Sequence, residues 1–203
     1  MTDMRYITGI ESYTGSGPTA VTLGKFDGLH RGHQKLVDKI REYASEKCES
    51  VLCAFDMHRD ALMTNRERRE HLEGKVDCLI EYPFTEDVRG MDAEAFVDQI
   101  LYRKLHAAHI VVGTDFTFGH GKKGTPELLK KLSGKYGFTV DVIEKERYAG
   151  TVISSTYIRD ALAQGDVKLA GEMIALAIQD SVKNKVPRDE GTEYEKYLSM
   201  LIK

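Results

Sequence analysis

The chain has 203 residues, of which 41% are hydrophobic and 30% are charged. This size and balance suit one soluble globular domain, with or without a small appendage. The net charge is -3 and the pI about 6.2, so no overall basic field would attract nucleic acid or a membrane. No apolar run approaches the roughly 20 residues of a membrane helix, and residues 1–5 lack the apolar segment of a signal peptide. We therefore expect a cytoplasmic protein without nucleic-acid or membrane partners, whose oligomeric state is unknown.

Strand-like and helix-like patterns alternate along the chain. Strands are expected at residues 5–7, 19–23, 50–55, 76–82, 109–113 and 138–144. Helices are expected at 34–46, 65–73, 92–105, 125–137, 154–164 and 166–177, and a final amphipathic helix within 187–203. This alternation favours an α/β fold with a parallel sheet wrapped by helices, which binds ligands beyond the carboxyl ends of its strands. We expect one domain over residues 1–186 and a helical extension over 187–203.

Several local signals support these elements. Asp92 and Thr125 are expected helix N-caps, and Pro126 follows Thr125 at the first helical position. Apolar residues at helical spacing predict the buried faces of two helices: Leu36, Val37, Ile40, Tyr43 and Ala44 in one, and Phe96, Val97, Ile100, Leu101 and Leu105 in the other. The three cysteines lack metal-type spacing, and Cys53 and Cys78 fall in predicted strands, so we expect buried, inert thiols.

His30 and His33 lie where the strand at 19–23 hands over to a helix. Helix N-termini attract anions, and Gly28 and Gly32 should let the backbone turn tightly and a bulky anion approach. The simplest chemical interpretation is a phosphate site. The alternatives are a pair of surface histidines and a metal pair, although no third ligand is close in the sequence. Asp27 is expected to orient a histidine, to bind a metal with the phosphates, or only to cap the turn.

Three hydroxyl residues, Ser154, Ser155 and Thr156, open a predicted helix. They are suited to capping, which needs no ligand. Ser155 and Thr156 could equally donate to phosphate oxygens. Arg159 lies one turn further on the same side as Ser155 and could make charge-assisted bonds to a pyrophosphate.

Three stretches resemble, in order, the adenylyltransferase module of bacterial FAD synthetase, the first half of the bifunctional riboflavin kinase/FMN adenylyltransferase. They are Phe26–Gln34, Val112–Gly119 and Ile153–Arg159. The pattern His30-x-Gly32-His33 is similar to the HxGH signature of Rossmann-like nucleotidyltransferases. The resemblance runs from about Val21 to about Leu176 and implies a doubly wound parallel sheet. The C-terminal helical appendage to this sheet is expected from the amphipathic pattern within 187–203.

The resemblance implies transfer of AMP from ATP, with Mg²⁺, to FMN as substrate, giving FAD and pyrophosphate as products. It implies catalytic roles for His30, His33 and Arg159. It implies ATP binding by Gly24, Lys25, Phe26, Asp27, Gly32, Ser155 and Thr156, and flavin binding by Asp115, Phe116, Phe118 and Lys122. Without a flavin, the glycine-rich stretch 113–124 would be a surface loop with one of its two phenylalanines in the core. Neither the sequence nor the resemblance indicates which residues would bind the metal ion.

The sequence departs from the family at three places. Lys122 stands near where the family usually has Arg, and lysine lacks the planar fork that grips a phosphate with two bonds. The segment Asp56–Asp60 lacks both prolines of the family motif, so the turn beside the expected acceptor pocket should be more flexible. We expect His58 to be a solvated loop residue. Only 203 − 178 = 25 residues follow Ile178, too few for a kinase domain, so we expect no riboflavin kinase activity. The alternatives are a nucleotidyltransferase for another phosphorylated acceptor and a non-catalytic flavin-nucleotide binder.

Overall fold

The computed structural model describes residues 3–56 and 61–174. They form two compact units: the first comprises residues 3–25, 36–56 and 74–144, and the second residues 26–35, 61–73 and 145–174. We describe each unit by itself. The predicted loop around His58, the predicted boundary after residue 186 and the final helix lie outside the described residues.

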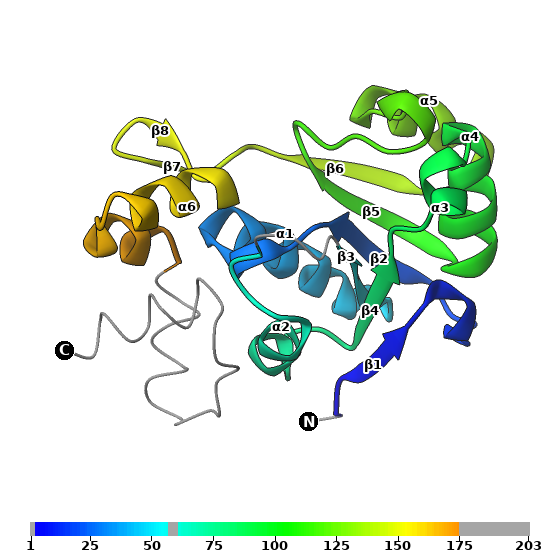
Figure 1. The fold of residues 1–203 in the computed structure, drawn as a ribbon. Coiled ribbons are helices and arrows are strands. Elements are labelled where there is room, and N and C mark those ends of the chain that lie inside the picture. The colour runs from blue at the N-terminus through cyan, green and yellow to red at the C-terminus, as the bar shows by residue number, and fades with distance from the viewer. Residues whose placement is uncertain (1–2, 57–60, 175–203) are drawn as a thin grey trace. The chain divides into compact units, whose positions relative to one another are not determined.

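Six parallel strands form the sheet of the first unit (Figure 1). They are β1 (Arg5–Thr8), β2 (Thr19–Gly24), β3 (Glu49–Asp56), β4 (Cys78–Pro83), β5 (Ala107–Gly113) and β6 (Thr139–Ile143), in the order β1-β4-β3-β2-β5-β6. The chain moves outward from β2 through β3 to β4 and then returns to β5 on the other side of β2. This reversal defines a doubly wound, Rossmann-like sheet and confirms the predicted fold class. In such sheets ligands bind beyond the carboxyl ends at the reversal point, here between β2 and β5.

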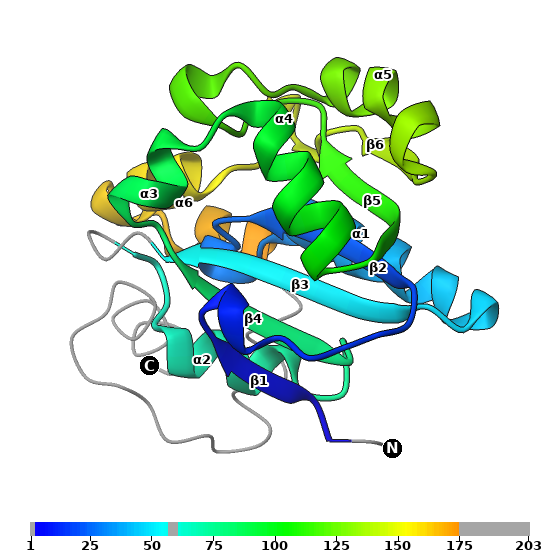
Figure 2. The same ribbon diagram turned by 90° about the vertical axis from the view of Figure 1, so that its right-hand side faces the viewer.

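Helices cover both faces of this sheet (Figures 1 and 2). One face packs against α4 (Ala93–Phe96), its π-helical continuation η4 (Val97–Lys104) and α5 (Pro126–Tyr136). Helix α1 (Arg31–Glu42) lies on the opposite side from α4, and its residues Leu36, Val37 and Ile40 are buried. All five residues of the predicted buried face in 92–105 are also buried. Because both faces are covered, the inner strands β2 and β4 are almost entirely buried, whereas the edge strands β1 and β6 are partly exposed.

The element boundaries differ from the sequence-based expectation in a few places. Helix α1 begins at Arg31 and ends at Glu42, where a 3₁₀ turn replaces it, so Ala44 is exposed rather than buried. The short helix α3 (Glu86–Gly90) was not expected. The predicted caps are confirmed: Asp92 accepts from Glu94 and Ala95 N–H, and Thr125 accepts from Leu128 N–H.

The second unit has a separate small core. It contains α2 (Asn65–Leu72), the hairpin of β7 (Arg147–Tyr148) and β8 (Thr151–Val152), α6 (Ser155–Ala163) and helical residues 167–174. Its buried apolar side chains come from α6, from helical residues 167–174 and from the segments before α2 and after β8; they are Leu62, Met63, Ile153, Ile158, Ala161, Ala170, Met173 and Ile174. The hairpin was not expected from the sequence. None of the helices in the two described ranges is long and apolar enough to span a bilayer.

All three cysteines are free and buried. Burial raises the pKa of Cys78 to about 12 and that of Cys53 further still. A thiol with such a pKa stays protonated at neutral pH and is a poor nucleophile and metal ligand. The expectation of inert thiols is therefore confirmed for Cys53 and Cys78.

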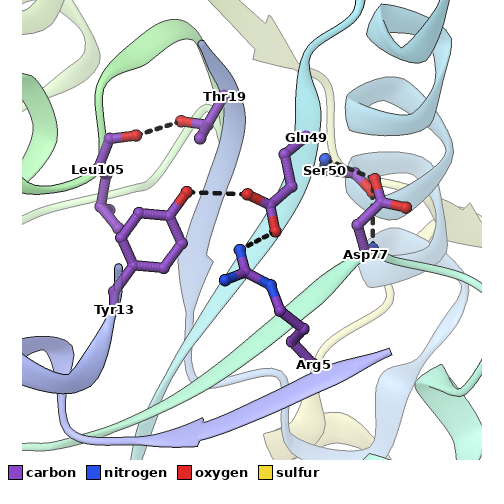
Figure 3. Close-up of polar contacts among 7 residues, drawn as sticks. All are labelled: Arg5, Tyr13, Thr19, Glu49, Ser50, Asp77 and Leu105. Atoms are coloured by element: carbon purple, nitrogen blue, oxygen red, sulfur yellow. Dashed lines mark hydrogen bonds and ion pairs between the residues drawn. The ribbon is translucent and has the colours of Figure 1, made fainter. Parts of the chain in front are cut away.

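Polar side chains tie the sheet together at the amino ends of its strands (Figure 3). Glu49, the first residue of β3, accepts a hydrogen bond from the Tyr13 hydroxyl at 2.9 Å and is paired with Arg5 of β1. Asp77, just before β4, accepts from Ser50 N–H at 2.8 Å and from the Ser50 hydroxyl at 2.7 Å. These contacts satisfy polar groups at the end of the sheet opposite to its carboxyl edge.

We predict that Glu49→Ala lowers the free energy of unfolding by about 1–3 kcal/mol, because the Tyr13 hydroxyl, on a residue only 2% exposed, loses its acceptor. Denaturant titration would measure this. Adding Tyr13→Phe should recover part of the loss, since no buried hydroxyl then remains unpaired. Glu42→Ala, which breaks an exposed pair with Lys39, is the matched control and should cost under about 0.5 kcal/mol. Equal losses in the two single variants would contradict the assignment.

Candidate functional site

The histidine segment begins with a tightly wound turn. Phe26, Gly28 and Leu29 all have positive φ, at 48°, 76° and 38°. The left-handed region costs non-glycine residues about 1–2 kcal/mol, so two of these three positions are strained and must be held by their surroundings. Gly28 is the position where glycine is needed: a Cβ atom there would lie 2.7 Å from Leu62 Cδ1. The predicted tight turn at Gly28 is therefore confirmed.

The tight turn predicted at Gly32 is not found. This glycine lies inside α1 rather than in a turn, and a Cβ atom there would lie 3.2 Å from both Cε1 and Nδ1 of the His30 ring. Glycine at position 32 therefore leaves space for the His30 imidazole, and no backbone turn requires it.

His30 and His33 form a stacked pair within the second unit. Their ring centroids are 3.7 Å apart and their planes differ by 17°. The His33 N–H donates to the His30 carbonyl at 2.8 Å and, more weakly, to His30 Nδ1 at 3.4 Å, so His30 caps the first turn of α1. The two imidazoles predicted to act together are in direct contact.

His33 is held in its neutral form. Its pKa is lowered well below the usual value by burial first, then by the nearby His30 and Arg68. Its Nδ1 is enclosed and has no hydrogen-bond partner among the described residues. Buried polar atoms rarely lack a hydrogen-bond partner, and an atom that lacks one is a place where a water molecule or an ion can bind. His33 Nδ1 therefore marks a place where a further polar group would be favourable.

Asp27 is the polar centre of the site. Its Oδ2 accepts from Arg159 Nη1 at 2.7 Å and its Oδ1 from the Leu62 N–H at 2.6 Å. Its backbone carbonyl accepts from the Ser155 hydroxyl at 2.8 Å. The carboxylate is the more enclosed member of its ion pair, at 13% exposure against 34% for Arg159. Of the roles considered from the sequence, none included this pairing with Arg159.

The three hydroxyl side chains at the start of α6 make different hydrogen bonds. Ser154 is the N-cap and accepts from Tyr157 N–H at 3.2 Å, as the capping interpretation predicts. Ser155 instead donates to Asp27, and exposed Thr156 lies 3.5 Å from Arg159 Nη2. Ser155 and Arg159, one turn apart, therefore meet the same residue of the histidine segment, as their predicted shared face requires.

A second ion-pair group lies beside the histidines. Glu146 binds Arg31 and Lys35, which lie in the first turns of α1. The hydrogen bond from Lys35 lowers the pKa of Glu146. Two cations near a helix N-terminus repel its partial positive charge, and Glu146 offsets this repulsion. No role was expected for Glu146 from the sequence.

Two buried charged residues of α2 were also missed. Glu67 and Arg68 are only 4% and 3% exposed. Glu67 and Thr64 form a capping box, and the Thr64-x-x-Glu67 spacing is a recognisable signal for it. Arg68 precedes buried Leu72 by four residues, so helical spacing places both on one face. These spacings could have identified both residues.

The other expected ligand-binding residues belong to the first unit. Asp115 and Lys122 are exposed, Phe116 is half-buried and Phe118 is buried at 6%. Phe118 packs against Phe96 and Phe116, with both pairs of ring centroids 5.5 Å apart. One phenylalanine of this loop thus lies in the core, as expected. Gly24 ends β2 and is half-buried, and the following residue, Lys25, is exposed.

No group of three or more His, Cys, Asp or Glu side chains in the described ranges is arranged to hold a metal ion. The described carboxylate closest to the histidines in sequence, Asp27, is engaged with Arg159 and Leu62. A divalent ion that arrives already bound to a triphosphate needs few protein ligands, since Mg²⁺ keeps waters and phosphate oxygens in its shell.

We predict that His33 makes folding stability fall with acidification. Below about pH 6.5 the His33 imidazole is protonated in the unfolded chain but stays neutral in the native protein, because its native pKa is lowered. The free energy of unfolding therefore drops by up to about 1.4 kcal/mol per pH unit until the native imidazole is also protonated. Denaturant titrations between about pH 7.5 and about pH 5.5 would measure the slope. His33→Asn should flatten it. An unchanged slope in this variant would show that His33 is not the group responsible.

Comparison with known proteins identifies the family. Residues 14–157 match the family model described as FAD synthetase. The chain is 33% identical over 184 residues to the bifunctional riboflavin kinase/FMN adenylyltransferase of Buchnera aphidicola subsp. Acyrthosiphon pisum, covering 84% of this chain and 59% of that protein. Against the Haemophilus influenzae protein of the same description, identity is 34%, with 76% and 54% covered.

Solved structures agree at the level of the fold. A Streptococcus pneumoniae crystal structure titled macrolide-efflux protein aligns with a TM-score of 0.75 and 27% identity, covering 85% of this chain and 62% of that one. The chain spans somewhat more than half the length of these two relatives and of this solved structure. Because the family model covers most of the described sheet and the histidine segment, the chain belongs to the FAD synthetase family.

Proposed function

We propose that this protein is an FMN adenylyltransferase, which transfers AMP from ATP to FMN and releases FAD and pyrophosphate. The observation that carries the proposal is the stacked His30–His33 pair, with Arg159 joined to the same segment through Asp27. The family supports it, and so does the description FMN adenylyltransferase printed for the matched relatives.

In the proposed reaction an oxygen of the FMN phosphate attacks the α-phosphorus of ATP directly. The bond from the α-phosphorus to the bridging oxygen breaks, and its electron pair leaves with pyrophosphate. Charge on the equatorial oxygens is stabilised by fixed donors, and we assign this role to His30 and His33. A phosphate is already a competent nucleophile at neutral pH, so no general base is needed and positioning supplies most of the rate.

The leaving group requires cations and donors at the β- and γ-phosphates. We assign Arg159, Ser155 and Thr156 to this task, because a guanidinium makes charge-assisted bonds to phosphate oxygens. In the structure Arg159 and Ser155 contact Asp27, so the carboxylate holds both near the histidines until phosphate oxygens compete for them. We propose that Mg²⁺ enters with the triphosphate.

The remaining assignments follow the family resemblance. We assign ATP binding to Gly24, Lys25, Phe26 and Gly32, and Phe26 would contribute its backbone because its side chain is fully buried. Asp115, Phe116 and Lys122 would contact the flavin, and Phe118 would support that loop from the core. The half-buried Phe116 ring is the one suited to an apolar ring system.

We predict that the purified protein makes FAD from ATP, Mg²⁺ and FMN, as seen by chromatography. His33→Asn should lower kcat by about 100- to 1,000-fold, because a donor to the reacting phosphate is misplaced. His106→Asn, at an exposed histidine with positive φ, is the matched control and should retain full activity. Riboflavin replaces FMN in a second control.

Two results would overturn the proposal. Pyrophosphate release only with a non-flavin acceptor would assign the chain to a different nucleotidyltransferase. Binding of FMN or FAD without turnover under any of these conditions would make it a flavin-nucleotide binder.

We predict that Gly32→Ala separates activity from stability. Alanine gains up to about 1 kcal/mol of helix propensity, yet its Cβ would press on the His30 ring at 3.2 Å. The Tm should stay level or rise while kcat falls about tenfold or more. Gly134→Ala, inside α5 where an added Cβ meets nothing within 4 Å, should raise the Tm and leave kcat unchanged. Equal kcat values in both variants would refute the packing argument.

A further inference from the structure

Helix α2 carries three arginines, and only one of them is enclosed. Arg66 is half exposed and pairs with Glu70, and Arg69 is exposed, whereas Arg68 is 3% exposed. Removing a guanidinium from water is costly unless its donors are satisfied by fixed partners. The hydrogen-bond partners of the buried Arg68 guanidinium therefore indicate which segment of the second unit α2 holds in place.

Arg68 binds the start of the histidine segment. Its Nε donates to the Phe26 carbonyl at 3.3 Å, and its Nη1 donates to Asn65 Oδ1 at 3.1 Å, which orients the guanidinium plane. Phe26 is the first of the strained positions, with φ 48° and ψ 36°. A charge-assisted bond to its carbonyl holds the peptide in a conformation that a non-glycine residue rarely keeps.

The contact continues from Phe26 to the histidines. The Phe26 side chain is fully buried, and its ring centroid lies 5.0 Å from that of His33 with the planes tilted by 47°. His33 in turn stacks on His30 at 3.7 Å. A displacement of Phe26 would thus move both imidazoles. The positive charge of Arg68 also acts on His33 directly and, together with His30 and burial, lowers its pKa.

We propose that Arg68 is a positioning residue for the His30–His33 pair, holding the Phe26 carbonyl and, through the Phe26 ring, fixing the place of His33. Its catalytic consequence rests on the proposed adenylyl transfer, whereas its effect on the two imidazoles does not. A flexible ammonium cannot replace the planar fork of arginine at such a site. The geometry and the charge of Arg68 can therefore be separated by substitution.

The test uses Arg68→Lys and Arg68→Met in the full chain, with Arg69→Lys and Arg69→Met as matched controls on the same helix. We expect Arg68→Met to lower kcat about tenfold or more, with a smaller change in the KM for ATP. In NMR titrations His33 should protonate at higher pH in Arg68→Met, because a positive charge is lost. Arg68→Lys should lower kcat while His33 still titrates at low pH. Both Arg69 variants should match the parent.

Several outcomes would overturn the proposal. A folded Arg68→Met protein with unchanged kcat and unchanged His33 titration would do so, as would equal effects from the Arg69 variants. If Arg68→Met does not fold, a folded Arg68→Lys protein with parental kcat and parental His30 and His33 ring signals would decide against it. The NMR readout needs no nucleotide, so a parent protein that forms no FAD would count against the proposed function and leave this test decisive.

Discussion

The carboxylate of Asp27 joins segments that are far apart in the sequence. It accepts from Leu62, 35 residues away, and from Arg159, 132 residues away, while its backbone carbonyl accepts from Ser155. A largely enclosed carboxylate is stable only with such donors, because an unpaired charge there would cost several kcal/mol. The same contacts bring the cation of α6 to the histidine segment. The arrangement of the candidate site thus follows from the hydrogen bonds and the ion pair of one partly buried carboxylate.

Backbone strain and close packing complete this arrangement. The turn at Phe26–Leu29 adopts left-handed conformations that two of its side chains disfavour. It persists because Arg68 holds the Phe26 carbonyl and the Phe26 ring packs on His33. Gly32 then leaves space for the His30 ring. Strain of this kind concentrates at functional sites, where the surrounding structure fixes a conformation that the chain alone would not choose.

Much of the fold was predictable because its signals are local. Apolar or alternating stretches indicated all six strands of the main sheet. Asp92 and Thr125 identified two helix starts, since a cap is decided by a few adjacent residues. Prediction failed where local signals are weak. The hairpin β7–β8 has two-residue strands, and Ala44 lies past the point where α1 gives way to a 3₁₀ turn. A helix was expected at 65–73, but the burial of Arg68 was not, although its spacing to Leu72 places both residues on one helical face.

The sequence by itself determined the order of strands and helices, the family resemblance and the identity of the histidine, serine and arginine candidates. Only the tertiary structure decided how these residues are used: that Ser154 caps while Ser155 binds Asp27, that Asp27 pairs with Arg159, and that Arg68 donates to the Phe26 carbonyl. The physical reason is distance along the chain. Periodicity and caps depend on residues within a turn or two, whereas hydrogen-bond partners and desolvation depend on which remote segments pack together.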